Sequence, residues 1–381
     1  MKKVLLAIDS FKGCLSSLEA ALAVEAGIKA VYPSCEVVKV PVADGGEGTV
    51  EALVWMTGGR LCTVEVNDPL MRPISASYGI LGDGCTAVIE MSAASGLPLV
   101  APEQRNPMIS TTVGTGQLIA DALNRGCKQF ILGLGGSATN DAGTGLLQAL
   151  GYRFLDANGK LLGQGGQILE HIAVIDSSSR NPLLNGTQFN MACDVDNPFS
   201  GKNGAACIFA PQKGADPYMV EALDRGLKHF AEVVKTQLCK DIDAVAGAGA
   251  AGGMGGGLMA FLDAQLRPGI QLVLDTLCFD DLLQGVDLVI TGEGRMDAQT
   301  AMGKTPSGVA EAAQRSGVPV IALTGNIEDA SAINRIGICG VFPIIPRPMS
   351  LMEAMNPETA ARNIQQAAEQ LFRWHRAILS Q

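Results

Sequence analysis

The residues best suited to chemistry lie in residues 287–304, with the sequence DLVITGEGRMDAQTAMGK. The apolar residues 288–290 are typical of a buried parallel strand, and ligands of α/β proteins bind where such strands end. The loop that follows carries two carboxylates, a guanidinium and an ammonium: Glu293, Asp297, Arg295 and Lys304. Gly292 and Gly294 flank Glu293 and let the backbone approach a ligand closely. The segment predicts a site for a charged ligand with a metal ion; the alternative is a solvated loop of mixed charge.

Four further polar loops follow apolar stretches, at residues 9–13, 44–49, 137–141 and 194–201. Together the five loops predict one crevice lined by strand ends. Magnesium prefers hard oxygen ligands, and phosphoryl transfer also needs cations and a carboxylate to accept the proton of an alcohol. Candidate metal ligands are Asp44, Glu47, Asp194, Glu293 and Asp297. Candidate cations are Lys12, Lys213, Arg295 and Lys304, although any single lysine has about an even chance of being a solvated surface residue.

Two glycine-rich segments are candidates for phosphate binding. Residues 135–139, GGSAT, are predicted to open a helix and to offer N–H groups and hydroxyls at its positive end. Residues 252–257, GGMGGG, offer a second cradle, and tight packing or a hinge explains them equally well. Neither segment has the GxxxxGK[ST] or GxGxxG spacing.

Composition excludes several classes of protein. The chain has 381 residues, 47% of them apolar, which is enough for two or three domains with large cores. A net charge of -10 with 4% aromatic residues argues against nucleic-acid binding. No long apolar run or leader pattern is present, and the ten cysteines form no CxxC pair, so we expect a cytoplasmic protein with reduced thiols and no membrane partner. The three histidines lie outside the polar loops, which argues against a Ser–His–Asp triad or a zinc site.

The elements that position these loops alternate between strand and helix at both ends of the chain. Ser16 and Glu19 have the spacing of a helix capping box, and Asn356 before Pro357 predicts the start of the last helix. Short, partly alternating strands after residue 60 predict a mixed sheet. We therefore predict an α/β fold: a doubly wound, Rossmann-like parallel-sheet domain from residues 1–65 and 286–381, an inserted α/β domain with a mixed sheet at 66–285, and an active site in the cleft between them.

The loops resemble, in sequence and order, those of the bacterial type-1 glycerate kinases, and the resemblance covers essentially the whole chain. The matching segments are DSFKG at 9–13, PVADGGEGT at 41–49, GLGGSATNDAG at 133–143, DVDNPFSG at 194–201, FAPQKGA at 209–215 and ITGEGRMDAQTAMGKTPSGVA at 290–310.

The resemblance implies phosphorylation of D-glycerate by ATP with Mg²⁺, at the 2-hydroxyl, in the catabolism of glyoxylate, glycolate or sugar diacids. The motif residues receive roles on physical grounds. Catalytic roles go to Lys12, Asp194 and Arg295, and substrate binding to Ser10, Asp44, Asn197, Lys213 and Lys304. Contacts with ATP go to Gly135, Gly136, Ser137, Thr139, Gly252, Gly253, Gly255 and Gly256, and the metal to Glu293 and Asp297. Open points are 2- against 3-phosphorylation, which carboxylate is the base, and whether the protein forms a homodimer.

Two alternatives remain. A different small-molecule kinase would use the Gly-Leu-Gly-Gly-Ser-Ala loop at 133–138 and act on a mevalonate- or galactose-like alcohol, which leaves the charges of residues 293–304 unexplained. A non-catalytic metabolite sensor would bind the ligands without releasing ADP.

Overall fold

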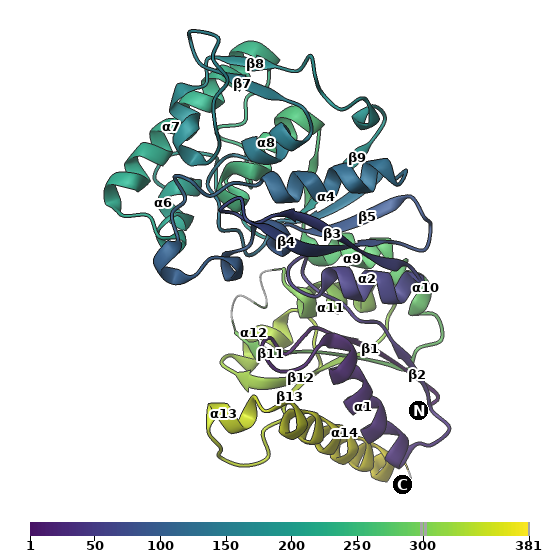
Figure 1. Ribbon diagram of the computed structural model, residues 1–381. Helices are drawn as coiled ribbons and strands as arrows, with labels where there is room; N and C mark the ends of the chain where they lie inside the picture. The colour runs from purple at the N-terminus through teal and green to yellow at the C-terminus, as the bar shows by residue number, and fades with distance from the viewer. Residues whose placement is uncertain (298–299, 301–302, 380–381) are drawn as a thin grey trace. The chain divides into compact units, whose positions relative to one another are not determined.

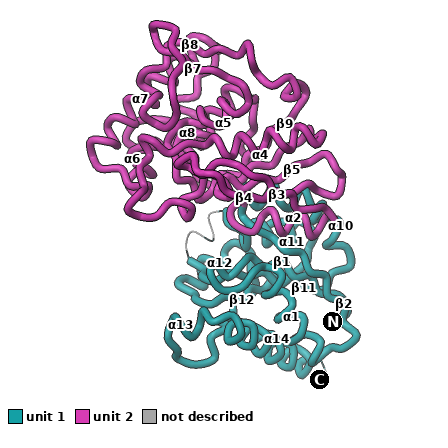
Figure 2. The backbone as a smooth tube through the Cα atoms, viewed as in Figure 1, with its two compact units in different colours: residues 1–44, 268–381 teal, residues 45–267 magenta. Residues whose placement is uncertain are grey.

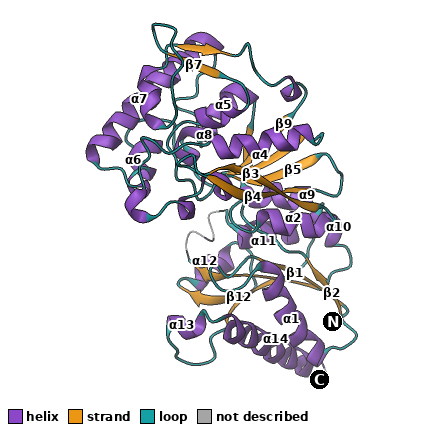
Figure 3. Cartoon of the chain, viewed as in Figure 1, coloured by secondary structure: helices purple, strands orange, loops and turns teal. Residues whose placement is uncertain are grey.

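The computed structural model describes residues 1–297, 300 and 303–379, which form two compact units (Figure 2). Unit 1 joins Met1–Asp44 to Pro268–Gln381, and unit 2 is Gly45–Arg267. Both units contain helices and a sheet, so the predicted mixed α/β composition is confirmed (Figure 3).

Unit 1 is built on a five-stranded parallel sheet. Its strands are β1 (Lys3–Ile8), β2 (Glu36–Lys39), β11 (Leu288–Met296), β12 (Val320–Ile327) and β13 (Gly340–Pro343). They lie in the order β13-β12-β11-β1-β2, so the first strand lies inside the sheet and the chain order reverses between β1 and β11. This is the doubly wound 2-1-3-4-5 order, which confirms the fold class predicted for the two chain ends.

Helices cover both faces of this sheet. They are α1 (Ser17–Val31), α9 (Gly269–Thr276), α10 (Phe279–Leu282), α11 (Thr305–Arg315), α12 (Ala330–Arg335), α13 (Leu351–Ala354) and α14 (Pro357–Leu379). α1 and α14 pack side by side against one face (Figure 1), where Val4, Leu6 and Ile8 of β1 share a core with Phe372. Ser16 and Glu19 form the predicted capping box of α1, and the Asn356 side chain accepts a hydrogen bond in the first turn of α14. Burial of a side chain such as Phe372 contributes about 1.5–3 kcal/mol.

Unit 2 contains the predicted mixed sheet. Its strands are β3 (Arg60–Asn67), β4 (Pro73–Ile80), β5 (Thr86–Glu90), β6 (Gln129–Gly133), β9 (Gln188–Ala192) and β10 (Gln265–Arg267), in the order β10-β9-β6-β5-β4-β3. β3, β4 and β5 are antiparallel neighbours, whereas β5, β6, β9 and β10 run parallel. A separate hairpin-like pair joins β7 (Arg153–Leu155) to β8 (Val174–Asp176).

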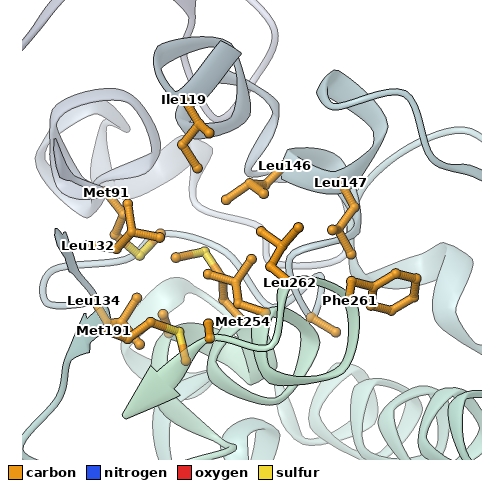
Figure 4. Packing of buried hydrophobic residues seen from close by; sticks show 14 of the residues in the cluster. Met91, Ile119, Leu132, Leu134, Leu146, Leu147, Met191, Met254, Phe261 and Leu262 are labelled. Atoms are coloured by element: carbon orange, nitrogen blue, oxygen red, sulfur yellow. The ribbon is translucent and has the colours of Figure 1, made fainter. Parts of the chain in front are cut away.

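The helices of unit 2 pack over an extensive apolar core. They are α2 (Thr49–Thr57), α3 (Ser92–Ser95), α4 (Val113–Asn124), α5 (Thr144–Ala149), α6 (Ala205–Phe209), α7 (Pro217–Leu238) and α8 (Ala250–Leu262). Figure 4 shows Leu132 of β6 and Met191 of β9 grouped with Ile119 of α4, Leu146 of α5 and Met254 of α8. This core holds the carboxyl ends of β5, β6 and β9 in fixed register, and polar loops follow these strand ends.

The unit boundaries fall earlier in the chain than the domain boundaries predicted at 65/66 and 285/286. β3 pairs with β4 along its length, so residues 60–67 lie in unit 2. α9 and α10 pack against α11, where Gly308 lies close to Ile270, so residues 269–282 lie in unit 1. Among the helices whose residues are described, none is long and apolar enough to cross a membrane.

Candidate functional site

In unit 1, the loops after β1 and β11 meet at the point where the strand order reverses. β1 and β11 are parallel neighbours, and the Asp9 N–H donates to the Gly292 carbonyl at 2.9 Å. Asp9, directly after β1, therefore lies beside Gly292 and Glu293 of β11, which continues to Met296. Doubly wound sheets bind their ligands in the crevice at such a switch point.

Asp9 is a buried carboxylate, 3% exposed. The Thr305 hydroxyl at the start of α11 donates to its Oδ2 at 2.9 Å, and the Ser10 N–H donates to its Oδ1 at 2.6 Å. Burial, reinforced by the charge of Asp44, raises the pKa of Asp9 to about 6. A cation bound beside such a carboxylate would favour its ionised form.

Glu293 lies in a similar environment. Burial raises the pKa of Glu293 to about 7, with the charge of Asp9 adding to the effect. The Thr300 hydroxyl donates to Glu293 Oε1 at 2.6 Å and accepts from the Asp297 N–H at 3.1 Å. The Thr300 N–H also donates to Asp297 Oδ1 at 3.3 Å, so Thr300 joins the two carboxylates that the sequence predicts to hold a metal.

Cations surround these carboxylates. Lys12 Nζ lies 3.6 Å from Asp44 Oδ2. Burial lowers the pKa of Lys12, but the charges of Asp44, Asp9 and Glu293 outweigh this effect and raise it above the ordinary value. Lys304 is the N-cap residue of α11, and its charge helps to lower the pKa of Glu293. Unit 1 thus brings Lys12 and Lys304, two of the three predicted lysines, near Glu293.

Arg295 is the third cation that the sequence predicts in this part of unit 1. It forms an ion pair with Glu328, and its Nε lies 3.7 Å from Asp297 Oδ2. Its side chain is 61% exposed. These two carboxylates orient the guanidinium while leaving much of its hydrogen-bonding fork accessible.

Unit 2 presents a second set of strand ends. Glu90, Gly133 and Ala192 occupy one register row at the ends of β5, β6 and β9. Residues 135–139 and the exposed Asp194 therefore follow neighbouring strands at the same edge of this sheet. Asn197 stabilises its own loop, because its Nδ2 donates to the Asn203 carbonyl at 2.8 Å.

The backbone of residues 135–137 is suited to an anion. In the described part of the chain, no hydrogen bond involves the N–H groups of Gly135, Gly136 or Ser137. Gly135 and Gly136 are exposed, and Gly136 has a φ of 74°, a conformation that glycine adopts without strain. Consecutive free N–H groups in such a bend can hold a phosphate.

The sequence predicts that residues 135–139 open a helix, and the structure does not show a helix there. α5 begins only at Thr144 and has six residues. The N–H groups of Gly143 and Gly145 at its start donate to the buried carboxylate of Asp141, at 3.1 and 3.3 Å. An anion at this loop would therefore meet the bend at 135–137 and no helix end.

The second glycine run is enclosed by protein. Residues 251–253 form a left-handed kink within α8, and all the glycines of residues 252–257 are buried. A Cβ on Gly252 would lie 2.1 Å from the Thr139 carbonyl oxygen, and one on Gly257 would lie 2.0 Å from the Ala142 carbonyl oxygen. Close backbone packing against residues 139–142 explains these glycines, as the alternative interpretation of the sequence proposes. A direct role of Gly252, Gly253, Gly255 and Gly256 with ATP stays a prediction.

Lys213, predicted from the sequence to bind substrate, is only 1% exposed. Its Nζ donates to Ser137 Oγ at 2.7 Å and to the Thr139 carbonyl at 2.6 Å. The ammonium thus supports the loop of residues 135–139 from inside unit 2.

Sequence reasoning did not select several side chains that shape the two sets of strand ends. Asp9 and Glu90 each end an apolar strand, the same pattern that singles out Glu293, so a signal was available for both. The Val50 N–H donates to Glu90 at 3.0 Å, and burial raises the pKa of Glu90 to about 7. Thr300 and Thr305 gave no sequence signal, because their partners become visible only when β1, β11 and α11 are assembled.

The donor set in unit 1 suits magnesium. Among the described residues, no group of three or more His, Cys, Asp and Glu side chains is arranged to hold a metal by itself. Magnesium at kinase sites needs only one or two protein carboxylates, with phosphates and water as its other ligands. Asp9 and Glu293 offer hard carboxylate oxygens, and burial, with the charge of a neighbouring carboxylate, raises the pKa of each.

Unit 1 has carboxylates and lysines at the strand ends of a doubly wound sheet, and unit 2 has a bend whose N–H groups bond none of the described residues; both features indicate an α/β enzyme that handles charged ligands. A family model described as the glycerate kinase family matches residues 4–376. The chain is 53% identical to a glycerate kinase of Haemophilus influenzae over 344 residues, which cover 90% of this chain and 91% of that one. It is 47% identical to the glycerate 2-kinase of Escherichia coli K12 over 368 residues, 95% of this chain and 97% of that one.

A solved structure agrees with these sequence matches. The crystal structure of a protein assigned as glycerate kinase 2, from Salmonella typhimurium LT2, matches with a TM-score of 0.92 and 46% identity, and covers 100% of both chains. The chain therefore belongs to the glycerate kinase family. It is a kinase, as the resemblance of its loops predicts.

Proposed function

We propose that this kinase transfers the γ-phosphoryl group of ATP to the 2-hydroxyl of D-glycerate, giving 2-phosphoglycerate and ADP. The observation that carries the proposal is the 47% identity to a glycerate 2-kinase over 95% of the chain. The charged groups of unit 1 support it, since a small hydroxy acid and a triphosphate both need cations in a chain of net charge -10.

The residues of unit 1 suit the reacting phosphoryl group and the acid. Lys12 and Lys304 provide positive charge beside the strand ends, and the Arg295 fork can hold a carboxylate through two parallel hydrogen bonds. Asp297 pairs with Arg295 and orients it, while Ser10 and Asp44 lie next to Asp9 and Lys12. Positioning and charge stabilisation of this kind supply most of the catalysis in phosphoryl transfer.

Magnesium would be held by Glu293 and Asp9. When bound, it supplies positive charge to the phosphate oxygens of ATP. Thr300 and Thr305 fix the two carboxylates by donating to them at 2.6 and 2.9 Å, so their oxygens keep a defined direction. We assign Asp297 to the support of Arg295 and Thr300 and leave the metal to the more buried pair.

In unit 2, the N–H bend at 135–137 is assigned to the phosphates of ATP. Asp194, exposed beyond the end of β9, is assigned as the base that accepts the proton of the glycerate hydroxyl. Asn197 lies three residues further on and shapes the same loop through its bond to Asn203.

The decisive experiment is NMR of the product formed from D-glycerate and ATP. We expect the phosphorus resonance to couple to the proton on C2, which identifies 2-phosphoglycerate. Coupling to the C3 protons would overturn the regiochemistry. Phosphorylation of mevalonate or galactose in place of glycerate would overturn the substrate, and binding of ATP and glycerate without ADP release would favour a sensor.

A further inference from the structure

Lys213 is the feature of unit 2 that the proposed reaction leaves unexplained. It ends a short turn, Pro211–Lys213, that follows α6, and its side chain is among the largest fully buried ones. Lysine is almost never buried without a partner, because removing an ammonium from water is costly. A buried lysine therefore needs a structural or functional reason.

The contacts of Lys213 all lead to the predicted phosphate loop. Its Nζ donates to Ser137 Oγ at 2.7 Å and to the Thr139 carbonyl at 2.6 Å. An ammonium has three donors and no acceptor, so it binds oxygen acceptors and leaves backbone N–H groups free. Lys213 thus binds two oxygen acceptors of the loop from inside unit 2. The N–H groups of residues 135–137 form no bond with the described residues.

Asp141 holds the other end of the same loop. It is fully buried, and it accepts from Thr112 N at 2.8 Å and Thr112 Oγ1 at 2.9 Å as well as from the start of α5. Its charge favours the protonated form of Lys213, which burial opposes. Residues 137–141 are thus fixed at one end by the buried amino group of Lys213, whose pKa burial lowers to about 7, and at the other by the buried carboxyl group of Asp141.

The loop also contains buried polar atoms that form no hydrogen bond with the described residues. Thr139 Oγ1 and both polar atoms of the Asn140 carboxamide are buried, and they make no hydrogen bond among the described residues. Buried polar groups are nearly always hydrogen-bonded, so an unsatisfied set in one loop indicates a site that a ligand or its water completes. The same loop therefore has a rigid support and unsatisfied polar groups.

We propose that Lys213 is a positioning residue for nucleotide binding: it holds residues 137–139 from inside so that the N–H groups of residues 135–137 face the phosphates of ATP. It does not contact glycerate. The proposal rests on the proposed function in taking ATP as the ligand of this loop, and it replaces the substrate-binding role that the sequence predicts for Lys213.

The test compares Lys213→Met with Lys240→Met. Lys240 is a matched control in the same unit, because its Nζ also donates to backbone carbonyls, those of Met259 and Ala260, away from the predicted loop. ATP binding is measured by calorimetry without glycerate, amide hydrogen exchange is followed in residues 135–139, and KM is measured for both substrates.

We expect Lys213→Met to raise the Kd and KM of ATP by roughly tenfold or more and to speed exchange in residues 135–139, with the KM of glycerate within about twofold of wild type. Lys240→Met should lower Tm while leaving ATP binding unchanged. Unchanged ATP binding in Lys213→Met, or a rise confined to the KM of glycerate, would overturn the proposal. Lys213→Gln, which keeps hydrogen-bond donors, should show a smaller change of the same kind and replaces the Met variant if that variant does not fold.

The ATP titration also separates this proposal from the proposed function. A wild-type protein that binds ATP but does not phosphorylate glycerate would contradict the function and leave the Lys213 comparison intact. A wild-type protein that binds no ATP would overturn both.

Discussion

At the scale of single residues, two carboxylates of unit 1 have the largest consequences, the buried Asp9 and the half-buried Glu293. Asp9 and Glu293 come from strands at opposite ends of the chain, and each is held by one threonine hydroxyl. Both have raised pKa values because they are buried near other carboxylates. In the metal-free protein, ionisation of these two carboxylates lowers the stability of the fold, and the proposed reaction uses the same negative charges.

Replacing Glu293 with Gln should separate these two effects. Burial raises the pKa of Glu293 from its ordinary value of 4.5 to about 7, so between these pH values the folded protein binds a proton that the unfolded chain releases. Wild-type stability should therefore fall by up to about 3 kcal/mol as the pH rises from about 4.5 to above 7. In Glu293→Gln this part of the pH dependence should be missing, while turnover should fall by roughly a hundredfold or more.

The measurement for Glu293→Gln is urea unfolding in EDTA between pH 4.5 and 8, together with turnover at saturating Mg²⁺. Glu353→Gln, an exposed carboxylate paired with Arg347, is the control and should change neither quantity. Equal pH dependence of stability in wild type and Glu293→Gln would contradict the raised pKa of Glu293.

Arg295→Lys tests whether the guanidinium is needed as a fork. Arg295 already contacts Glu328 and Asp297, and a lysine cannot keep both contacts and also hold a carboxylate by two hydrogen bonds. We expect kcat/KM for D-glycerate to fall by roughly tenfold or more, with little change in Tm. Arg347→Lys, at an exposed pair with Glu353, should leave kinetics unchanged. Wild-type kinetics in Arg295→Lys would remove Arg295 from the site.

Much of the unit 1 site could be predicted from residue type and spacing alone. Lys12, Asp44, Glu293 and Lys304 were selected because they follow apolar strands. The structure places Lys12 within electrostatic reach of Asp44 and Glu293, and Lys304 within reach of Glu293. Thr305 could not be selected, because its bond to Asp9 joins residues 296 positions apart. The burial of Lys213 could not be predicted either, because a local motif does not show whether a lysine side chain points into the core.

At the scale of elements, the kink that begins α8 shows how glycine can be required by packing. Ala142 N donates to the Gly252 carbonyl at 3.0 Å, so this kink and the loop of residues 139–142 are in backbone contact. The kink is glycine-rich, and the sequence alone does not distinguish glycine backbone that approaches a phosphate from glycine backbone that approaches other backbone. The strand and helix pattern was easier to predict, because periodicity and caps such as Ser16 with Glu19 act locally.

A series of glycine-to-alanine variants should measure this packing. Gly163→Ala has open space and no positive φ, so we expect almost no change in the free energy of unfolding. Gly186→Ala, with a φ of 73° and open space, should cost about 1–2 kcal/mol. Gly252→Ala, with a φ of 70° and a Cβ 2.1 Å from the Thr139 carbonyl oxygen, should cost about 1–3 kcal/mol more than Gly186→Ala. Denaturant unfolding gives all three values, and equal costs for Gly186→Ala and Gly252→Ala would rule out the close contact.

At the scale of the whole molecule, the two units differ in how the chain builds them. Unit 2 is one continuous segment with a core of its own, whereas the core of unit 1 joins residues 4–35 to residues 290–372. The doubly wound order could be predicted because both chain ends show the same strand–loop–helix rhythm. The boundaries could not be placed from that rhythm, because the membership of β3, α9 and α10 depends on the partners they pack against.

This difference predicts how fragments of the chain behave. Residues 45–267 keep every strand of the mixed sheet and its core, so we expect this fragment to fold alone and to melt in one cooperative transition followed by circular dichroism. Residues 1–267 add β1, α1 and β2 without β11 or α14, which leaves the apolar faces of Val4, Leu6 and Ile8 uncovered. We expect this longer fragment to bind a hydrophobic dye and to show fast amide exchange in residues 3–39, with no gain in Tm over residues 45–267. Protection of residues 3–39 in the longer fragment, or a non-cooperative melt of residues 45–267, would show that the units do not fold as the separate cores imply.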